Sequence, residues 1–174
     1  MDIYWIETEQ PKSKAAHDLL ERILRKNYGI EAPKLSYGPQ GKPYLPDGPE
    51  FSISHTHGAV AVAIGNAPMG LDLERIRQFH ELVPKRIMSP GEYSWFCRRG
   101  EMKHDFFALW TLKESYFKYL GTGLQGFPNN TEFRFDGKYW HLEGETLYFQ
   151  QWEEKNLLMT LCSHEQEVVI LHRL

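Results

Sequence analysis

The sequence has 174 residues, with 20 Lys and Arg against 23 Asp and Glu, a formal net charge of -3 at pH 7 and 41% hydrophobic residues. This length suits one ordinary domain, or two small halves that share a core, and it can bury enough apolar surface to fold without disulfides. The 14% aromatic content and the lack of a sustained heptad pattern exclude a disordered chain, collagen and a coiled coil. The near-neutral charge also argues against a protein that coats nucleic acid, because such surfaces are usually strongly basic.

The start of the chain and its composition predict a cytoplasmic protein. Asp2 is acidic and only a short apolar run follows it, so the N-terminus lacks the charged start and long apolar stretch of a signal peptide. No window approaches the roughly 20 apolar residues of a membrane span. Two cysteines are too few for a disulfide framework. We therefore expect a cytoplasmic protein that binds neither a membrane nor nucleic acid.

The first part of the chain predicts a strand, a helix and a loop. Residues 3–6 form a short strand pattern, and residues 12–28 carry apolar side chains at helical spacing before Gly29, which stands where a C-terminal cap belongs. Residues 32–49 hold five of the ten prolines and three glycines. That composition is typical of a stiff loop.

The rest of the chain predicts strands on both sides of two helices. Ser89-Pro90-Gly91-Glu92 has the form of a capping box that begins a helix, and a longer helix is expected from Asp105 to Leu120. Strands are expected at 51–54, 59–64, 70–74, 131–135, 146–152, 157–162 and 167–171. This order predicts an α+β fold of two similar halves, an N-terminal half of residues 1–68 and a C-terminal half of residues 69–174.

Two carboxylates are predicted to share one face of a strand. Asp72 and Glu74 lie two residues apart, so both side chains leave the same face while Leu71 and Leu73 point to the other. Adjacent carboxylates repel each other unless a cation or a proton intervenes, and Mg²⁺ prefers oxygen ligands of this kind. A strand with one solvent-exposed face shows the same pattern, so the pair alone does not establish a metal site.

Two other clusters each allow two interpretations. Trp110, Glu114 and Lys118 fall at i, i+4 and i+8 of a predicted helix and so lie along one face. An exposed ion pair worth about 0.3–0.5 kcal/mol has the same spacing.

The stretch 54–58, Ser-His-Thr-His-Gly, can present a hydroxyl, an imidazole and backbone N–H groups to a phosphate. Histidines in turns are also commonly exposed to solvent.

Four motifs, in this order, resemble a known family. They are Gly41-Lys42-Pro43, Phe51-Ser52-Ile53-Ser54-His55, Gly70-Leu71-Asp72-Leu73-Glu74, and Trp110-Thr111-Leu112-Lys113-Glu114-Ser115 followed by Lys118. Over about half of the chain they resemble the 4'-phosphopantetheinyl transferases of the surfactin-synthetase-activating type. The resemblance implies a pseudo-dimeric α+β fold with the active site between the halves. It also implies a reaction in which the phosphopantetheinyl arm of coenzyme A moves to a serine of an apo acyl or peptidyl carrier protein, releasing adenosine 3',5'-bisphosphate.

The resemblance further implies roles for individual residues. The ligands of Mg²⁺ or Mn²⁺ would be Asp72, Glu74 and Glu114. The contacts to the coenzyme A phosphates would be Lys42, Ser54, His55, Lys113 and Lys118. Glu114, directly or through a water, would remove the proton of the carrier serine, and Lys118 would stabilise or protonate the leaving phosphate. Glu114 and Lys118 are therefore the expected catalytic residues.

Several alternatives stay open at this point. A coenzyme A or carrier-binding module without activity, or a Mg²⁺-dependent pyrophosphate hydrolase, would carry the same carboxylates. Glu92 either caps its helix or takes part in the site. The residues that hold the adenine and 3'-phosphate are not identified by a motif.

The partner surface is expected to be basic, because carrier proteins are typically acidic. Lys and Arg outnumber Asp and Glu between Lys85 and Lys118. We expect the carrier to dock there through Arg98, Arg99 or Lys103. A monomer is expected, since two halves of one chain can complete a site between them.

Overall fold

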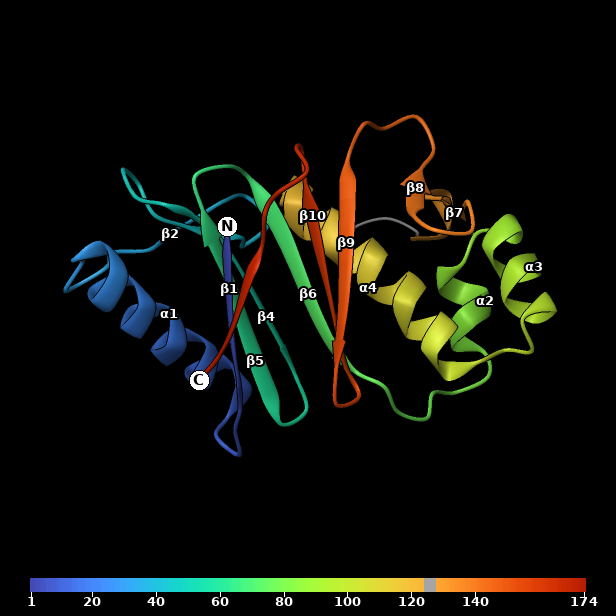
Figure 1. Ribbon diagram of the computed structural model, residues 1–174, viewed down its shortest axis with the longest axis horizontal. Helices are drawn as coiled ribbons and strands as arrows, with labels where there is room; N and C mark the ends of the chain where they lie inside the picture. Colours follow the sequence, from blue (N-terminus) through green and yellow to red (C-terminus); the bar gives the residue numbers. More distant parts are fainter. Residues whose placement is uncertain (124–127) are drawn as a thin grey trace.

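Two small sheets, each packed against one long helix, form the two halves of the protein (Figure 1). The computed structural model describes residues 1–123 and 128–174. Its elements are β1 (Asp2–Glu7), α1 (Lys12–Tyr28), β2 (Ser36–Tyr37), β3 (Pro43–Tyr44), β4 (Glu50–Thr56), β5 (Ala59–Gly65), β6 (Met69–Arg75), α2 (Val83–Ile87), α3 (Pro90–Arg98), α4 (Lys103–Leu120), the short 3₁₀ helix η1 (Pro128–Asn130), β7 (Phe133–Phe135), β8 (Trp140–Leu142), β9 (Tyr148–Glu154), β10 (Leu157–Ser163) and β11 (Ile170–Arg173). The fold is therefore α+β, as the sequence predicts.

The two halves share one topology. In the first half α1 follows β1 and the strands are ordered β1-β5-β4, and in the second α4 lies between β6 and the pair β9 and β10, with the order β6-β10-β9. All four of these strand pairs are antiparallel. The expectation of a pseudo-dimer is thereby confirmed.

The last strand of the chain joins the sheet that contains the first strand. β11 pairs in parallel with β1, with Leu171 opposite Ile3, so the first sheet is extended to β11-β1-β5-β4. Residue 68 lies in the connection between β5 and β6. The ranges 1–68 and 69–174 remain a prediction, and residues 124–127 of the second range lie outside the described residues.

Three apolar clusters hold these layers together. On one face of the first sheet, Leu20 and Leu24 of α1 share a cluster with Val62 of β5. On its other face, Ile3 shares a cluster with Leu71 of β6, so the two halves have a common core. The third cluster lies beneath α4 and includes Phe106, Leu109, Leu112 and Leu158. β5 and β10 are buried on both faces, and their sequences are therefore nearly continuous runs of apolar residues.

Helix α4 lies very close to β6 because residue 70 is glycine. A Cβ atom at Gly70 would lie 2.9 Å from the Cα atom of Tyr119 and closer still to the backbone of Ser115. Only glycine permits this approach of two backbones. α4 ends at Leu120, and Gly121, with a φ of 70°, supplies the left-handed cap that follows it. The close packing places the helix that carries Glu114 directly against the strand that carries Asp72.

The predicted helices are present, with small shifts. α3 begins with the expected capping box, in which the Glu92 N–H donates to Ser89 Oγ at 3.1 Å and the Ser89 N–H donates to Glu92 Oε2 at 2.8 Å. α4 begins at Lys103, two residues before the expected start. The sequence does not predict α2, β8 or the β2–β3 pair, because elements of two to five residues are too short to show a period. No helix in the described part of the chain is long and apolar enough to cross a bilayer.

Candidate active site

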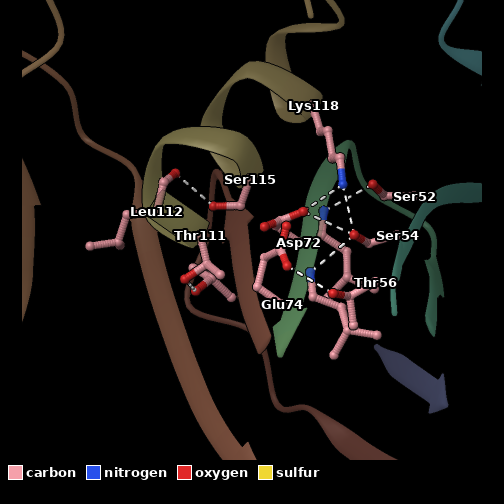
Figure 2. Close-up of polar contacts among 12 residues, drawn as sticks. Ser52, Ser54, Thr56, Asp72, Glu74, Thr111, Leu112, Ser115 and Lys118 are labelled. Carbon is pink, nitrogen blue, oxygen red and sulfur yellow. Dashed lines mark hydrogen bonds and ion pairs between the residues drawn. The ribbon is translucent and has the colours of Figure 1, made fainter. Parts of the chain in front are cut away.

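Side-chain hydroxyls link β4 to β6 at the boundary between the halves. Among the described residues no backbone ladder joins these two strands. Instead, three β4 side chains, which we call the hydroxyl rungs, accept hydrogen bonds from backbone N–H groups of β6 (Figure 2). The pairs are Ser52 with Leu71 (2.9 Å), Ser54 with Leu73 (3.0 Å) and Thr56 with Arg75 (3.3 Å). The period of two places all three hydroxyls on one side of β4 and fixes its register against β6.

Asp72 is buried beside Lys118. Its Oδ1 accepts hydrogen bonds from Ser54 Oγ at 2.9 Å and from Lys118 Nζ at 2.7 Å. Lys118 Nζ also donates to Ser54 Oγ at 2.8 Å. Oδ2 of Asp72 is buried and has no hydrogen-bond partner among the described residues. A buried carboxylate oxygen without a partner is costly, so this atom is suited to bind a cation.

Glu74 lies one step further along the same face of β6. Thr56 Oγ1 donates to Glu74 Oε2 at 2.8 Å, and Arg77 Nη1 donates to the same oxygen at 3.1 Å. Figure 2 shows the carboxylates of Asp72 and Glu74 on the same side of the strand. The predicted pairing of these two side chains on one face is therefore present.

Glu114 brings a third carboxylate to this face from α4. Burial raises its pKa to about 7, and the negative charges of Asp72 and Glu74 add to the rise, while Lys118 opposes it. The Glu114 carboxylate therefore lies in a poorly solvated region, within reach of the charges of Asp72 and Glu74. Glu114 can therefore gain or lose a proton near neutral pH.

A cavity of about 210 Å³ lies beside these groups, between the loop that precedes β4 and the end of α4. Its lining includes Gln40, Lys42, Ser52, Ile53, Phe117 and Lys118. Lys42 Nζ donates to the carbonyl oxygens of Met69 (3.1 Å) and Tyr119 (3.4 Å), and burial lowers the pKa of this lysine. Two ammonium groups in a partly apolar cavity suit an anion that carries an apolar portion.

Ser54 and His55 occupy different positions relative to this cavity. The Ser54 hydroxyl is engaged with Asp72, Lys118 and the Leu73 N–H. His55 is exposed and is not among the residues that line the cavity. The sequence motifs assign no role to Ser52 or Thr56, although hydroxyl side chains alternate along residues 52–56.

Lys113 does not reach the cavity. Its side chain is 0% exposed, and Nζ lies 2.9 Å from Oε2 of Glu92, which is equally buried. Nζ also donates to the Thr131 carbonyl oxygen, while Glu92 Oε1 accepts from the Phe133 N–H at 2.8 Å. Burial raises the pKa of Glu92 and lowers that of Lys113. The expected phosphate contact of Lys113 is therefore not supported, and Glu92 has the structural role that its capping box suggests.

The three carboxylates suit a hard divalent cation by their chemistry. Within residues 1–123 and 128–174, no three His, Cys, Asp or Glu side chains converge on one point, and the Lys118 ammonium lies against Asp72. The donor set nevertheless consists only of oxygen, as Mg²⁺ prefers. Oδ2 of Asp72 lacks a partner. The pKa of Glu114 is raised first by burial and then by the negative charges of Asp72 and Glu74, and a cation would offset the effect of these charges.

The chain belongs to the 4'-phosphopantetheinyl transferase superfamily, whose family model matches residues 68–165. A 4'-phosphopantetheinyl transferase of Bacillus subtilis is 36% identical over 112 residues, which cover 61% of this chain and 50% of that protein. The 4'-phosphopantetheinyl transferase Sfp of Bacillus subtilis (strain 168) is 32% identical over 112 residues, with the same shares. These matches confirm the predicted family, and the chain spans about half the length of these relatives.

Among solved structures, the holo-[acyl-carrier-protein] synthase (AcpS) of Thermotoga maritima is similar to part of this chain. Its TM-score is 0.49 and its sequence identity is 22%, over 55% of this chain and 61% of that chain.

Proposed function

We propose that the protein transfers the 4'-phosphopantetheinyl arm of coenzyme A to a serine hydroxyl of an apo acyl or peptidyl carrier protein, releasing adenosine 3',5'-bisphosphate. The observation that carries this proposal is the ion pair of the buried Asp72 with Lys118, at 2.7 Å, where Lys118 lines the same cavity as Lys42 and the charges of Asp72 and Glu74 act on Glu114. Membership of the superfamily and the names of the relatives support it.

The residues of the site fall into two groups, those that would bind a divalent cation and those that would bind the phosphates of coenzyme A. Asp72, Glu74 and Glu114 would hold Mg²⁺ or Mn²⁺ through their oxygen atoms. Such an ion, when bound, neutralises charge on the pyrophosphate of coenzyme A and helps to fix its geometry. Lys42 and Lys118 would bind phosphate oxygens from the wall of the cavity, with His55 as a third contact. Ser54 would act by orienting Asp72 and Lys118.

The proposed reaction needs one proton acceptor and one stabiliser of the leaving group. The carrier serine Oγ attacks the phosphorus atom next to the pantetheine arm, so that an Oγ–P bond forms and the P–O bond to adenosine 3',5'-bisphosphate breaks. Glu114 takes the serine proton, directly or through a water. Lys118 stabilises the charge on the leaving phosphate or donates a proton to it.

The proposed activity is tested by incubating the protein with coenzyme A, Mg²⁺ and an apo carrier protein. We expect the carrier to gain the mass of one phosphopantetheinyl arm, measured by mass spectrometry. Glu114→Gln keeps the side-chain size but removes the base, so the initial rate should fall by at least about 100-fold. Asp72→Ala should abolish transfer as well. Glu81→Gln, which removes an exposed carboxylate elsewhere, is the control and should leave the rate unchanged.

The same experiment separates the alternatives. Cleavage of coenzyme A without a gain of carrier mass would favour a pyrophosphate hydrolase. Binding of coenzyme A without either product would favour a binding module and would contradict the proposed transfer.

The carrier is proposed to dock at the adjoining ends of α3 and α4. Arg98, Arg99 and Lys103 are exposed there, although Arg99 pairs with Asp105 at 2.9 Å. Lys103 precedes Glu114 by eleven residues of α4, a distance of about 16 Å along the helix axis. The buried Lys113 adds nothing to this surface.

Reversing charge at this surface should slow modification of the carrier. For Lys103→Glu we expect a lower rate at low ionic strength and a weaker dependence on salt, with an unchanged KM for coenzyme A. Lys34→Glu reverses an exposed lysine in the first half and is the control. Equal rates for native protein and Lys103→Glu at every salt concentration would contradict this docking site.

We also propose that the protein acts as a monomer in the cytoplasm. Lys42 and the hydroxyl rungs come from the first half, while the carboxylates and Lys118 come from the second. Because one chain supplies both sets, a second copy is not needed to complete the site.

A further inference from the structure

We propose that Thr56 is a positioning residue, which holds the Glu74 carboxylate in the orientation that a divalent cation requires. The inference rests on the cation site of the proposed function. No motif of the family resemblance includes Thr56, and its side chain is buried and is not part of the cavity lining.

The Thr56 hydroxyl is placed to fix Glu74 relative to the backbone. It is 2% exposed. It donates to Glu74 Oε2 at 2.8 Å and accepts from the Arg75 N–H at 3.3 Å. A hydroxyl has one donor and two acceptor lone pairs, and the second lone pair faces Arg77 Nη1 at 3.4 Å. All three hydrogen-bonding positions of the Thr56 hydroxyl are therefore occupied, and two of the bonds link the Glu74 carboxylate to the Arg75 N–H of β6.

The same arrangement occurs one step earlier along β4. Ser54 Oγ donates to Asp72 Oδ1 and accepts from the Leu73 N–H. In both cases a rung bonds one carboxylate and the N–H group of the residue that follows it. Ser52 bonds the Leu71 N–H, but the residue before Leu71 is Gly70, where α4 packs. The repeat indicates that two of the three rungs orient carboxylates.

Without Thr56, the remaining donor to Glu74 would draw the carboxylate outward. Arg77 is bonded to the same oxygen, and its side chain is 53% exposed, against 17% for Glu74. In the present structure both donors engage Oε2, and the Glu74 carboxylate is turned toward that of Asp72 (Figure 2). Residues that orient metal ligands in this way typically change metal affinity by about 10–100-fold when they are removed.

The test measures Mn²⁺ binding to the full chain by electron paramagnetic resonance, with Mn²⁺ alone and no coenzyme A. We expect Thr56→Val, which keeps the shape but removes the hydroxyl, to weaken Mn²⁺ binding by about tenfold or more. Thr56→Ser keeps the hydroxyl and should restore most of the affinity. Thr111→Val is the matched control, because Thr111 is a buried α4 threonine whose hydroxyl bonds Phe107 and Ala108 carbonyls; it should leave Mn²⁺ affinity unchanged.

The outcomes separate this inference from the proposed transfer. Equal Mn²⁺ affinity in native protein and Thr56→Val, or no Mn²⁺ binding by the native protein, would overturn the role of Thr56. Weakened binding in Thr56→Val together with rescue by Thr56→Ser would support it, even if the carrier assay showed no transfer. If Thr56→Val does not fold, Thr56→Ala, which places no methyl group at the hydroxyl position, takes its place with the same expected loss.

Discussion

Replacing Lys113 with methionine is expected to lower the free energy of unfolding by about 3–5 kcal/mol. The Lys113 ammonium and the Glu92 carboxylate lie 2.9 Å apart, and neither side chain is exposed. Methionine fills a similar volume, but it leaves a carboxylate buried without its counter-charge. Urea unfolding followed by circular dichroism measures the change.

The loss of stability in Lys113→Met should depend on pH. Burial raises the pKa of Glu92 above the ordinary 4.5, and Lys113 opposes this rise, so the variant has a still higher pKa. A carboxyl group with a raised folded-state pKa contributes stability below its unfolded pKa, and that contribution is lost as pH rises through the folded value. The variant should therefore be closer to the native protein in stability at about pH 5 than at about pH 8.

Two further variants test the explanation. Lys103→Met removes an exposed lysine from the same helix and should change stability by less than about 0.5 kcal/mol. Adding Glu92→Gln to Lys113→Met should recover part of the loss, because no charge is then buried. A loss that is independent of pH and is not relieved by Glu92→Gln would contradict the buried ion pair.

Gly70→Ala is expected to destabilise the protein by at least about 3 kcal/mol and to abolish transfer. The added methyl group would overlap the backbone of Ser115 and Tyr119, and a backbone cannot move aside as a side chain can. α4 would have to shift away from β6, which would separate Lys118 from Asp72. Thermal unfolding measures the first effect and the carrier mass assay measures the second.

Gly65→Ala provides the matched control at the end of the neighbouring strand β5. A Cβ atom there would meet only flexible methionine side chains, at 3.3 Å from Met1 and 3.5 Å from Met69. We expect this variant to fold and to transfer normally. If Gly70→Ala proved as stable and as active as Gly65→Ala, the close contact of α4 and β6 would not be required for the site.

Local signals explain why most of the fold could be predicted from the sequence. α1 shows apolar residues at helical spacing before Gly29, and that glycine does adopt the left-handed cap. Ser89 and Glu92 show the capping box because the motif is complete within four residues. The partner of β11 could not be predicted, since nothing near residues 170–173 indicates pairing with a strand formed by residues 2–7.

The candidate site shows where sequence patterns stop being sufficient. The spacing of Asp72 and Glu74 predicts a shared face because a strand has a period of two. The sequence resemblance predicts a phosphate contact for Lys113, whereas the structure pairs this lysine with Glu92 in the interior. A buried lysine and a phosphate-binding lysine cannot be told apart in sequence, and Glu92 lies on another helix. Thr56 is missed for a related reason, since its role depends on a strand contact made through side chains rather than a backbone ladder.

The parallel pairing of β11 with β1 has a consequence for biosynthesis. As the chain leaves the ribosome, β1 emerges early, but one of its edges has no partner until residues 170–173 are available. The first sheet is thus completed only after the second half has been made. Contacts so distant in sequence slow folding, because the intervening chain must be ordered first. The halves are therefore expected to mature together once residues 170–173 are available, rather than one after the other.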